Sequence, residues 1–171
     1  MWAPWRKTYL RSSSVKRPGC LFCSLLREKK DKRNLVLFRT AYHVVVLNRY
    51  PYNNGHLMIV PKRHIACLSQ LNVREKADFF EVLEKVMGAL SKAMKPHGFN
   101  LGMNISDVAG AGIPDHVHWH IVPRWKGDVN FMPVVAGTKV ISESLESAYE
   151  VLSQALARKT HVGRRVSKRK K

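Results

Sequence analysis

Short apolar runs separated by polar and turn-forming residues mark several strands along the chain. The apolar runs LVLF at 35–38 and HVVVLN at 43–48 are rich in branched side chains, which favour strands. A third run, HLMIVP at 56–61, follows the turn sequence NRYPYNNG, and a fourth, FNLGMNI at 99–105, precedes a glycine-rich segment. Short strands joined by short turns predict an antiparallel sheet.

Two later stretches show the period of a helix. Apolar residues recur at intervals of three and four over 73–94, directly after Asn72 and Glu75, which stand at the spacing of a capping box. Ser142 is expected to cap a second helix over 143–157. One long helix and a C-terminal helix that cover an antiparallel sheet predict an α+β domain.

The sequence PDHVHWHIVPRW adds chemistry to this picture, because His116, His118 and His120 stand at two-residue intervals. In a straight strand the three rings would share one face, about 6.6 Å apart, opposite Val117 and Trp119. They would form the polar side of a surface strand, a three-histidine metal site, or an imidazole row that faces a substrate. A surface strand would carry mixed polar residues, and the outer two rings, about 13 Å apart, cannot both reach one metal ion.

Composition sets the class of protein. The chain has 171 residues and 45% hydrophobic residues, which is enough for one domain with a proper core. No apolar run approaches the roughly 20 residues that span a bilayer. The opening residues also lack the apolar stretch of a signal peptide. We therefore expect a cytoplasmic protein without a membrane segment.

The charge is strongly basic and unevenly placed. The chain has 30 basic and 12 acidic residues; residues 1–33 hold ten of the basic ones, and residues 158–171 hold eight with no acidic residue. The sequence predicts a single domain over 1–157 and a basic, disordered tail over 158–171. Such a tail is expected either to make weak nonspecific contacts with nucleic acid through phosphate or only to aid solubility.

Cys20 and Cys23 form a Cys-x-x-Cys pair, which in a cytosolic protein indicates metal or redox chemistry rather than a structural disulfide. A redox pair would open a helix after a strand, whereas this pair follows Lys-Arg-Pro-Gly. A structural zinc site needs four ligands, and His64 and His116 are candidates for the other two. The alternative is a pair of cysteines that are merely packed.

Several motifs together resemble one known family. HVHWHIV fits the signature His-φ-His-φ-His-φ-φ of the histidine triad (HIT) family, where φ is an apolar residue. NRYPYNNGHLMIVPKRHIACLSQL and HIVPRWKGD resemble the fragile histidine triad (FHIT) branch. WAPWR, CLFC and GMNISDVAGAG are most similar to prokaryotic diadenosine tetraphosphate phosphorylases and related HIT hydrolases. The resemblance covers roughly residues 2–155 and implies a HIT-like fold that forms a homodimer.

The resemblance implies nucleotidyl transfer. Dinucleoside polyphosphates of the diadenosine tetraphosphate type would be cleaved by phosphorolysis or hydrolysis through a covalent nucleotidyl-histidine. His118 would be the nucleophile, with a neutral ring whose other nitrogen donates to a backbone carbonyl, and His120 would contact phosphate oxygens. Two alternatives are an adenosine phosphoramidase of the HINT branch and a nucleotide- or RNA-binding module that uses the basic termini.

The resemblance also implies the remaining ligands. Asn48 would contact the ribose, His56 would lie near the site, Asn104 would reach the bridging phosphate, and the segment around Gly110 and Gly112 would present backbone N–H groups to phosphate. A structural zinc ion would be held by Cys20, Cys23, His64 and His116. Whether magnesium accompanies the nucleotide is left open. Many HIT hydrolases carry a hydroxyl just before the first histidine, and Gly-Ile-Pro at 112–114 lacks it, so the acceptor stays open between water and phosphate.

Overall fold

The computed structural model describes residues 19–28, 30–128 and 143–157. Its centre is a five-stranded sheet in the order β1-β2-β3-β5-β4, with every neighbouring pair antiparallel. The strands are β1 (Val36–Arg39), β2 (His43–Leu47), β3 (Leu57–Pro61), β4 (Gly98–Gly102) and β5 (Trp119–Arg124). The helices are α2 (Leu21–Arg27), the 3-10 helix η1 (Leu68–Gln70), α3 (Val73–Met94) and α5 (Leu145–Ala157). The predicted α+β class is confirmed.

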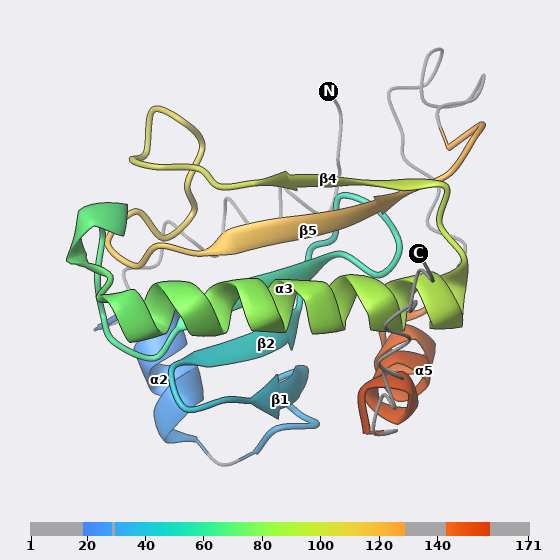
Figure 1. The fold of residues 1–171 in the computed structure, drawn as a ribbon, viewed down its shortest axis with the longest axis horizontal. Coiled ribbons are helices and arrows are strands. Elements are labelled where there is room, and N and C mark those ends of the chain that lie inside the picture. The colour runs from blue at the N-terminus through green and yellow to red at the C-terminus, as the bar shows by residue number, and fades with distance from the viewer. Residues whose placement is uncertain (1–18, 29, 129–142, 158–171) are drawn as a thin grey trace, which may run out of the picture.

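Helix α3 lies across one face of the sheet, and α5 packs beside it near β1 (Figure 1). Trp119 of β5 points to this face, where its ring lies 4.2 Å from that of Phe79. Met58 pairs with His120 one position along from the Ile59–Trp119 pair. Because side chains alternate across a strand, Met58 and His120 face the other side of the sheet, away from α3.

The long helix begins as its sequence predicts. The side chain of Asn72 accepts from the Glu75 N–H at 2.9 Å, and the Glu75 carboxylate accepts from the Asn72 N–H at 2.8 Å. The buried side of α3 packs Val86 and Leu90 into the core, both without exposed surface. The helix ends at Met94, and the C-cap residue Lys95 has left-handed backbone angles.

The two shorter helices differ from expectation. The predicted cap, Ser142, lies outside the described residues, as does the tail at 158–171; α5 begins at Leu145, and the Ser144 hydroxyl accepts from the Ser147 N–H. Helix α2 was not predicted, because seven residues are too few to show a helical period. It forms directly after Cys20 and is anchored by Phe22, which is 2% exposed.

The predicted strand across all three histidines is wrong at its start. β5 begins at Trp119, so only His120 of the three lies within a strand. The reason is that the Val117 N–H donates to the carbonyl of Ile65 at 2.7 Å, outside the sheet, and Val117 packs with Ile65 and Leu71 in a separate small cluster. β4 is likewise shorter than predicted, so Asn104 lies beyond its end.

Among the described residues, no helix is both long enough and apolar enough to cross a membrane.

Candidate functional site

Two cysteines and two histidines converge beside helix α2. Cys20 stands at the N-cap of α2 and Cys23 lies in its first turn, so the helix brings both sulfurs to its start. His64 follows β3, and His116 precedes β5. Their ligand atoms all lie within 4.8 Å of one another. The structure therefore brings together the four residues that the sequence offered as metal ligands.

The distances within this cluster suit a tetrahedral metal ion. Nδ1 of His116 lies 3.3 Å from Sγ of Cys20 and 3.7 Å from Sγ of Cys23, and Nδ1 of His64 lies 3.3 Å from Sγ of Cys23. Ligands bound tetrahedrally at zinc distances are separated by roughly 3.5 Å. The donor set of two sulfurs and two nitrogens is one that structural zinc sites use. The cluster can hold a metal ion.

The tautomer of His116 is fixed for such a role. Its Nε2 lies 2.9 Å from the backbone carbonyl of Pro61, an acceptor only, so Nε2 carries the proton and Nδ1 turns its lone pair toward the sulfurs. Burial lowers the pKa of His116, which keeps the ring neutral. Burial, and then the neighbouring Cys20, raises the pKa of Cys23 and favours its neutral thiol; a bound cation would oppose this shift and favour the thiolate.

His118 presents the opposite nitrogen. Its Nδ1 donates to the backbone carbonyl of His116 at 2.8 Å, which leaves the lone pair of the neutral ring on Nε2. The side chain is 5% exposed, and the ring of Phe22 lies 5.0 Å away. Burial lowers the pKa of His118, so the ring is neutral at physiological pH. A buried, neutral imidazole with a fixed tautomer can act as a nucleophile through Nε2.

A second chain of hydrogen bonds fixes His120. The Tyr52 N–H donates to Nδ1 of His56 at 3.0 Å, so the proton of the neutral His56 ring resides on Nε2. That Nε2–H donates to Nδ1 of His120 at 2.9 Å, which places the His120 proton on its own Nε2. The rings of His118 and His120 are 5.0 Å apart. The site thus places a lone pair and an N–H donor on neighbouring imidazoles.

The predicted substrate-binding residues fall into two groups. Nδ2 of Asn48 lies 3.3 Å from Nδ1 of His56, which joins Asn48 to the chain that ends at His120. Asn104 and Gly110 form a separate pair, in which Nδ2 of Asn104 donates to the Gly110 carbonyl at 3.3 Å. Gly112 is exposed in the same segment.

The glycine segment already uses two of its backbone donors. The Gly110 N–H donates to the carbonyl of Asp107 at 2.8 Å, and the Ala111 N–H donates to that of Ser106 at 3.2 Å. Gly110 has φ +86°, which glycine adopts without strain and which closes this turn on itself. In this conformation, the expected donation of these two N–H groups to a phosphate requires the turn to open.

Sequence reasoning missed three residues of the site. Phe22 covers His116 and His118, and the Pro61 carbonyl fixes His116. Tyr52 stacks on His56 with ring centroids 4.8 Å apart. Phe22 lies inside the CLFC motif and Tyr52 follows Asn-Arg-x-Pro, so their places next to known motifs could have identified them as site residues. The role of the Pro61 carbonyl could not be identified in this way, because every residue has a backbone carbonyl.

Comparisons with known proteins agree with this geometry. A family model described as the HIT domain matches residues 29–127. An AP-4-A phosphorylase of Mycobacterium tuberculosis is 37% identical over 165 residues, which cover 92% of this chain and 84% of that protein. An adenosine 5'-monophosphoramidase of Schizosaccharomyces pombe is 32% identical, over 62% of this chain and 74% of that protein. A solved structure titled as a hypothetical histidine triad nucleotide-binding protein from Sulfolobus tokodaii superposes with a TM-score of 0.65 at 25% identity, over 80% of this chain and 91% of that one.

Proposed function

This chain belongs to the HIT domain family, and on that basis we propose that it cleaves dinucleoside polyphosphates of the diadenosine tetraphosphate type through a nucleotidyl group held on His118. The observation that carries the proposal is the 2.8 Å hydrogen bond from Nδ1 of His118 to the His116 carbonyl. It leaves Nε2 as the nucleophilic atom of a neutral ring. The M. tuberculosis relative, named an AP-4-A phosphorylase, supports the substrate class.

The reaction has two displacements at one phosphorus atom. In the first, Nε2 of His118 attacks the phosphorus bonded to the nucleoside; a P–N bond forms, and the P–O bond to the departing polyphosphate breaks. In the second, an oxygen of the acceptor attacks the same phosphorus and the P–N bond breaks. His118 then regains its neutral form, and no proton needs to leave Nδ1.

His120 is placed to stabilise charge on the transferred group. In the tautomer held by the His56 Nε2–H bonded to its Nδ1, the His120 ring carries its proton on Nε2, which would donate to a phosphate oxygen of the bound nucleotide. Asn48 beside His56 would bind the ribose, and Asn104, Gly110 and Gly112 would line the phosphate side. These assignments are part of the proposal.

Cys20, Cys23, His64 and His116 would hold zinc. With four protein ligands such an ion has no open position, so it supplies rigidity rather than chemistry. His116 would transmit this rigidity, because its ring faces the sulfurs while its own carbonyl holds Nδ1 of His118. The protein residues alone carry out the two displacements.

Phosphate is the preferred acceptor. The supporting observation is the name of the M. tuberculosis relative, an AP-4-A phosphorylase. Diadenosine tetraphosphate incubated with and without phosphate separates the outcomes. ADP plus ATP indicates phosphorolysis, two ADP symmetric hydrolysis, and AMP plus ATP asymmetric hydrolysis. Parallel reactions with a chelator or added magnesium test the need for that cation. No turnover in any of them would refute the proposed substrate.

The similarity to the S. pombe adenosine 5'-monophosphoramidase supports a second candidate function, hydrolysis of adenosine phosphoramidate. Turnover of adenosine phosphoramidate above that of diadenosine tetraphosphate would favour it. An RNA-binding module is the other rival. Deletion of 158–171 separates the two. An enzyme should keep its turnover of diadenosine tetraphosphate, whereas an RNA-binding module should lose its affinity for RNA.

We also propose that the chain is cytoplasmic, folds as one domain over 1–157, and forms a homodimer through β4. Among the described strands β4 is an edge of the sheet, and Leu101 on it is 50% exposed. An exposed apolar edge strand is suited to pair with another copy. Light scattering coupled to size-exclusion chromatography gives the mass, and a monomer at micromolar concentration would contradict the dimer.

A further inference from the structure

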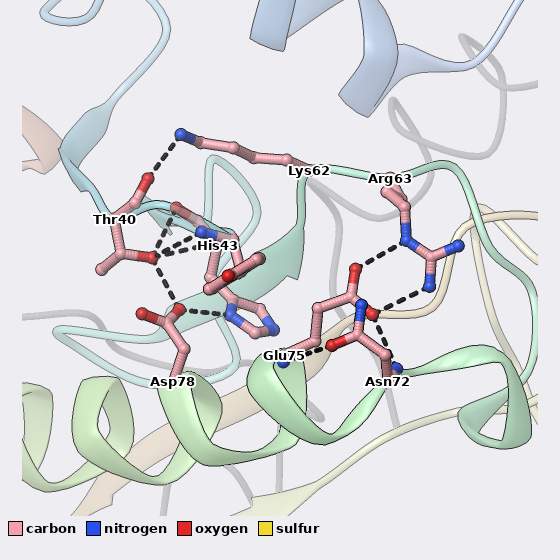
Figure 2. A network of polar contacts seen from close by, with 8 residues as sticks. Thr40, His43, Lys62, Arg63, Asn72, Glu75 and Asp78 are labelled. Carbon is pink, nitrogen blue, oxygen red and sulfur yellow. Dashed lines mark hydrogen bonds and ion pairs between the residues drawn. The ribbon is translucent and has the colours of Figure 1, made fainter.

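Residues 61–64, which include the last residue of β3 and the three that follow it, are each tied to another part of the molecule. The Pro61 carbonyl accepts from Nε2 of His116, and His64 joins the sulfur cluster. Between them, the Lys62 ammonium bonds to the carbonyl of Thr40, and the Arg63 guanidinium bonds to Glu75 of α3 (Figure 2). The segment 61–64, which carries His64, is therefore bonded to His116, to the carbonyl of Thr40 and to helix α3.

The contact between Arg63 and Glu75 is two-pronged. Nε of Arg63 donates to Oε1 of Glu75 at 2.6 Å, and Nη2 donates to Oε2 at 2.8 Å (Figure 2). Glu75 is 2% exposed, and the Arg63 guanidinium lowers its pKa to about 2. A buried carboxylate paired in this way is rigid, because moving Arg63 away would leave an unpaired buried charge.

Arg63 also closes the exposed segment that carries His64. Its Nη2 donates to the carbonyl of Gln70 at 2.5 Å, and the Gln70 side chain accepts from the Ala66 and Cys67 N–H groups at 3.0 Å each. The His64 side chain is exposed, whereas Ile65 beside it is buried in the small cluster with Val117. Arg63 therefore anchors the chain on one side of His64, and the burial of Ile65 anchors it on the other.

A simpler role for Glu75 is to cap α3. The Asn72 side chain and the Glu75 carboxylate already complete the capping box without Arg63. The Arg63 guanidinium makes none of the hydrogen bonds of the capping box, and it contributes only an ion-pair partner for the Glu75 carboxylate. Arg63 links the capped end of α3 to the residue before His64, which capping alone does not require.

We propose that Arg63 and Glu75 are positioning residues that hold His64 in place for metal binding. The inference rests on the metal site proposed above. A preorganised ligand binds more tightly because the segment is already ordered before the metal arrives. Residues that support a metal ligand typically change affinity roughly 10–100-fold when lost.

The test compares two matched arginines. Zinc affinity of the full chain is measured by competition with a chromophoric chelator, for wild type, Arg63→Gln and Arg124→Gln. Arg124 makes the same kind of two-pronged contact with Asp128, at 2.6 and 2.8 Å, and lowers the pKa of Asp128 to about 2, but it is not adjacent to any cluster residue. Arg63→Gln should bind zinc roughly 10–100-fold more weakly, and Arg124→Gln should match wild type.

Two further variants separate positioning from stability. Asn72→Ala damages the cap of α3 but keeps Arg63 and Glu75, so its zinc affinity should equal that of wild type. Arg63→Lys keeps the positive charge but cannot make the two-pronged contact with Glu75. Its zinc affinity should lie between those of wild type and Arg63→Gln. The visible spectrum of the Co²⁺-loaded protein should change its ligand-field bands in Arg63→Gln alone.

The outcomes are distinguishable. Wild-type protein that binds no zinc removes both the metal site and this inference. Tight binding by wild type together with equal affinity of Arg63→Gln, or equal losses in Arg63→Gln and Arg124→Gln, overturns the inference and leaves the metal site standing. If Arg63→Gln does not fold, Glu75→Gln and Arg63→Lys take its place, with the same expected ordering against Arg124→Gln.

Discussion

The backbone carbonyl of His116 accepts a hydrogen bond from Nδ1 of His118 at 2.8 Å. The same His116 turns Nδ1 of its ring to within 3.3 Å of the Cys20 sulfur. One residue therefore links the sulfur cluster to the tautomer of the neighbouring histidine.

His118→Ala should abolish nucleotidyl transfer, with turnover of diadenosine tetraphosphate at least about 10⁴-fold lower. The reason is that no other imidazole of the site offers its Nε2 lone pair. Acid quench of wild type with substrate labelled in the adenylate should trap label on the protein at His118, and the variant should trap none. His120→Asn serves as the control, because it should still form the intermediate, but slowly. Label on a different side chain would contradict the mechanism.

His56→Leu should lower kcat by about 10²-fold with a small change in KM. The substitution removes the Nε2–H that holds the tautomer of His120. A His56→Leu/His120→Leu double variant should lose little more than the larger single loss, because the two rings act through one hydrogen bond. Steady-state kinetics on the four proteins measures the coupling, and additive losses would argue against a shared role.

The first displacement should depend on pH through a group that titrates below the ordinary histidine value of about 6.5. Burial lowers the pKa of His118, so the neutral nucleophile persists as pH falls through 6.5 and is lost only below it. The same shift makes unfolding easier in acid, since the unfolded ring binds the proton first. Single-turnover rates against pH give the midpoint. A midpoint above that of free imidazole would show that His118 is not the titrating nucleophile.

Removal of the metal should destabilise the protein. Zinc that is 1,000-fold above its Kd stabilises a folded protein by about 4 kcal/mol, and chelation would remove that contribution. Cys20→Ser should lose zinc in elemental analysis and unfold at a lower denaturant concentration. Cys67→Ser is the matched control, because Cys67 is exposed and lies outside the cluster. Equal metal content in Cys20→Ser and wild type would refute the assigned ligand.

Gly55→Ala should destabilise the fold by about 2–3 kcal/mol. Gly55 has φ +67°, and an added Cβ would lie 2.6 Å from Sδ of Met94 and 3.2 Å from Cδ2 of Leu90. Gly88→Ala should do the opposite and stabilise by about 0.5–1 kcal/mol, because Gly88 lies within α3 with open space around it. Urea denaturation compares the two alanine variants, and a neutral Gly55→Ala would mean that Met94 moves aside freely.

The local elements could be predicted closely from the sequence. Apolar runs bounded by turn residues located the first strands, and Asn72 with Glu75 placed the start of α3 at the observed residue. The family motif supplied the residue types of the site. These features succeed because each depends on neighbours a few positions apart, whose spacing is written directly in the chain.

Other features needed the folded molecule. The histidine ladder implied one straight strand, but the bond from Val117 to Ile65 takes His116 out of that strand and turns it toward the cysteines. Helix α2 forms because Phe22 packs beneath it, which no helical period in so short a segment reveals.

The sequence by itself determined which side chains were available, the strands and long helix that carry them, and the family to which they belong. Tertiary structure alone decided which nitrogen of each imidazole carries its proton and that Cys23 and His116, 93 residues apart, would meet. The physical reason is that tautomers follow from backbone carbonyls and N–H groups brought up by packing, and long-range convergence follows from packing too. Neither leaves a periodic trace in the chain.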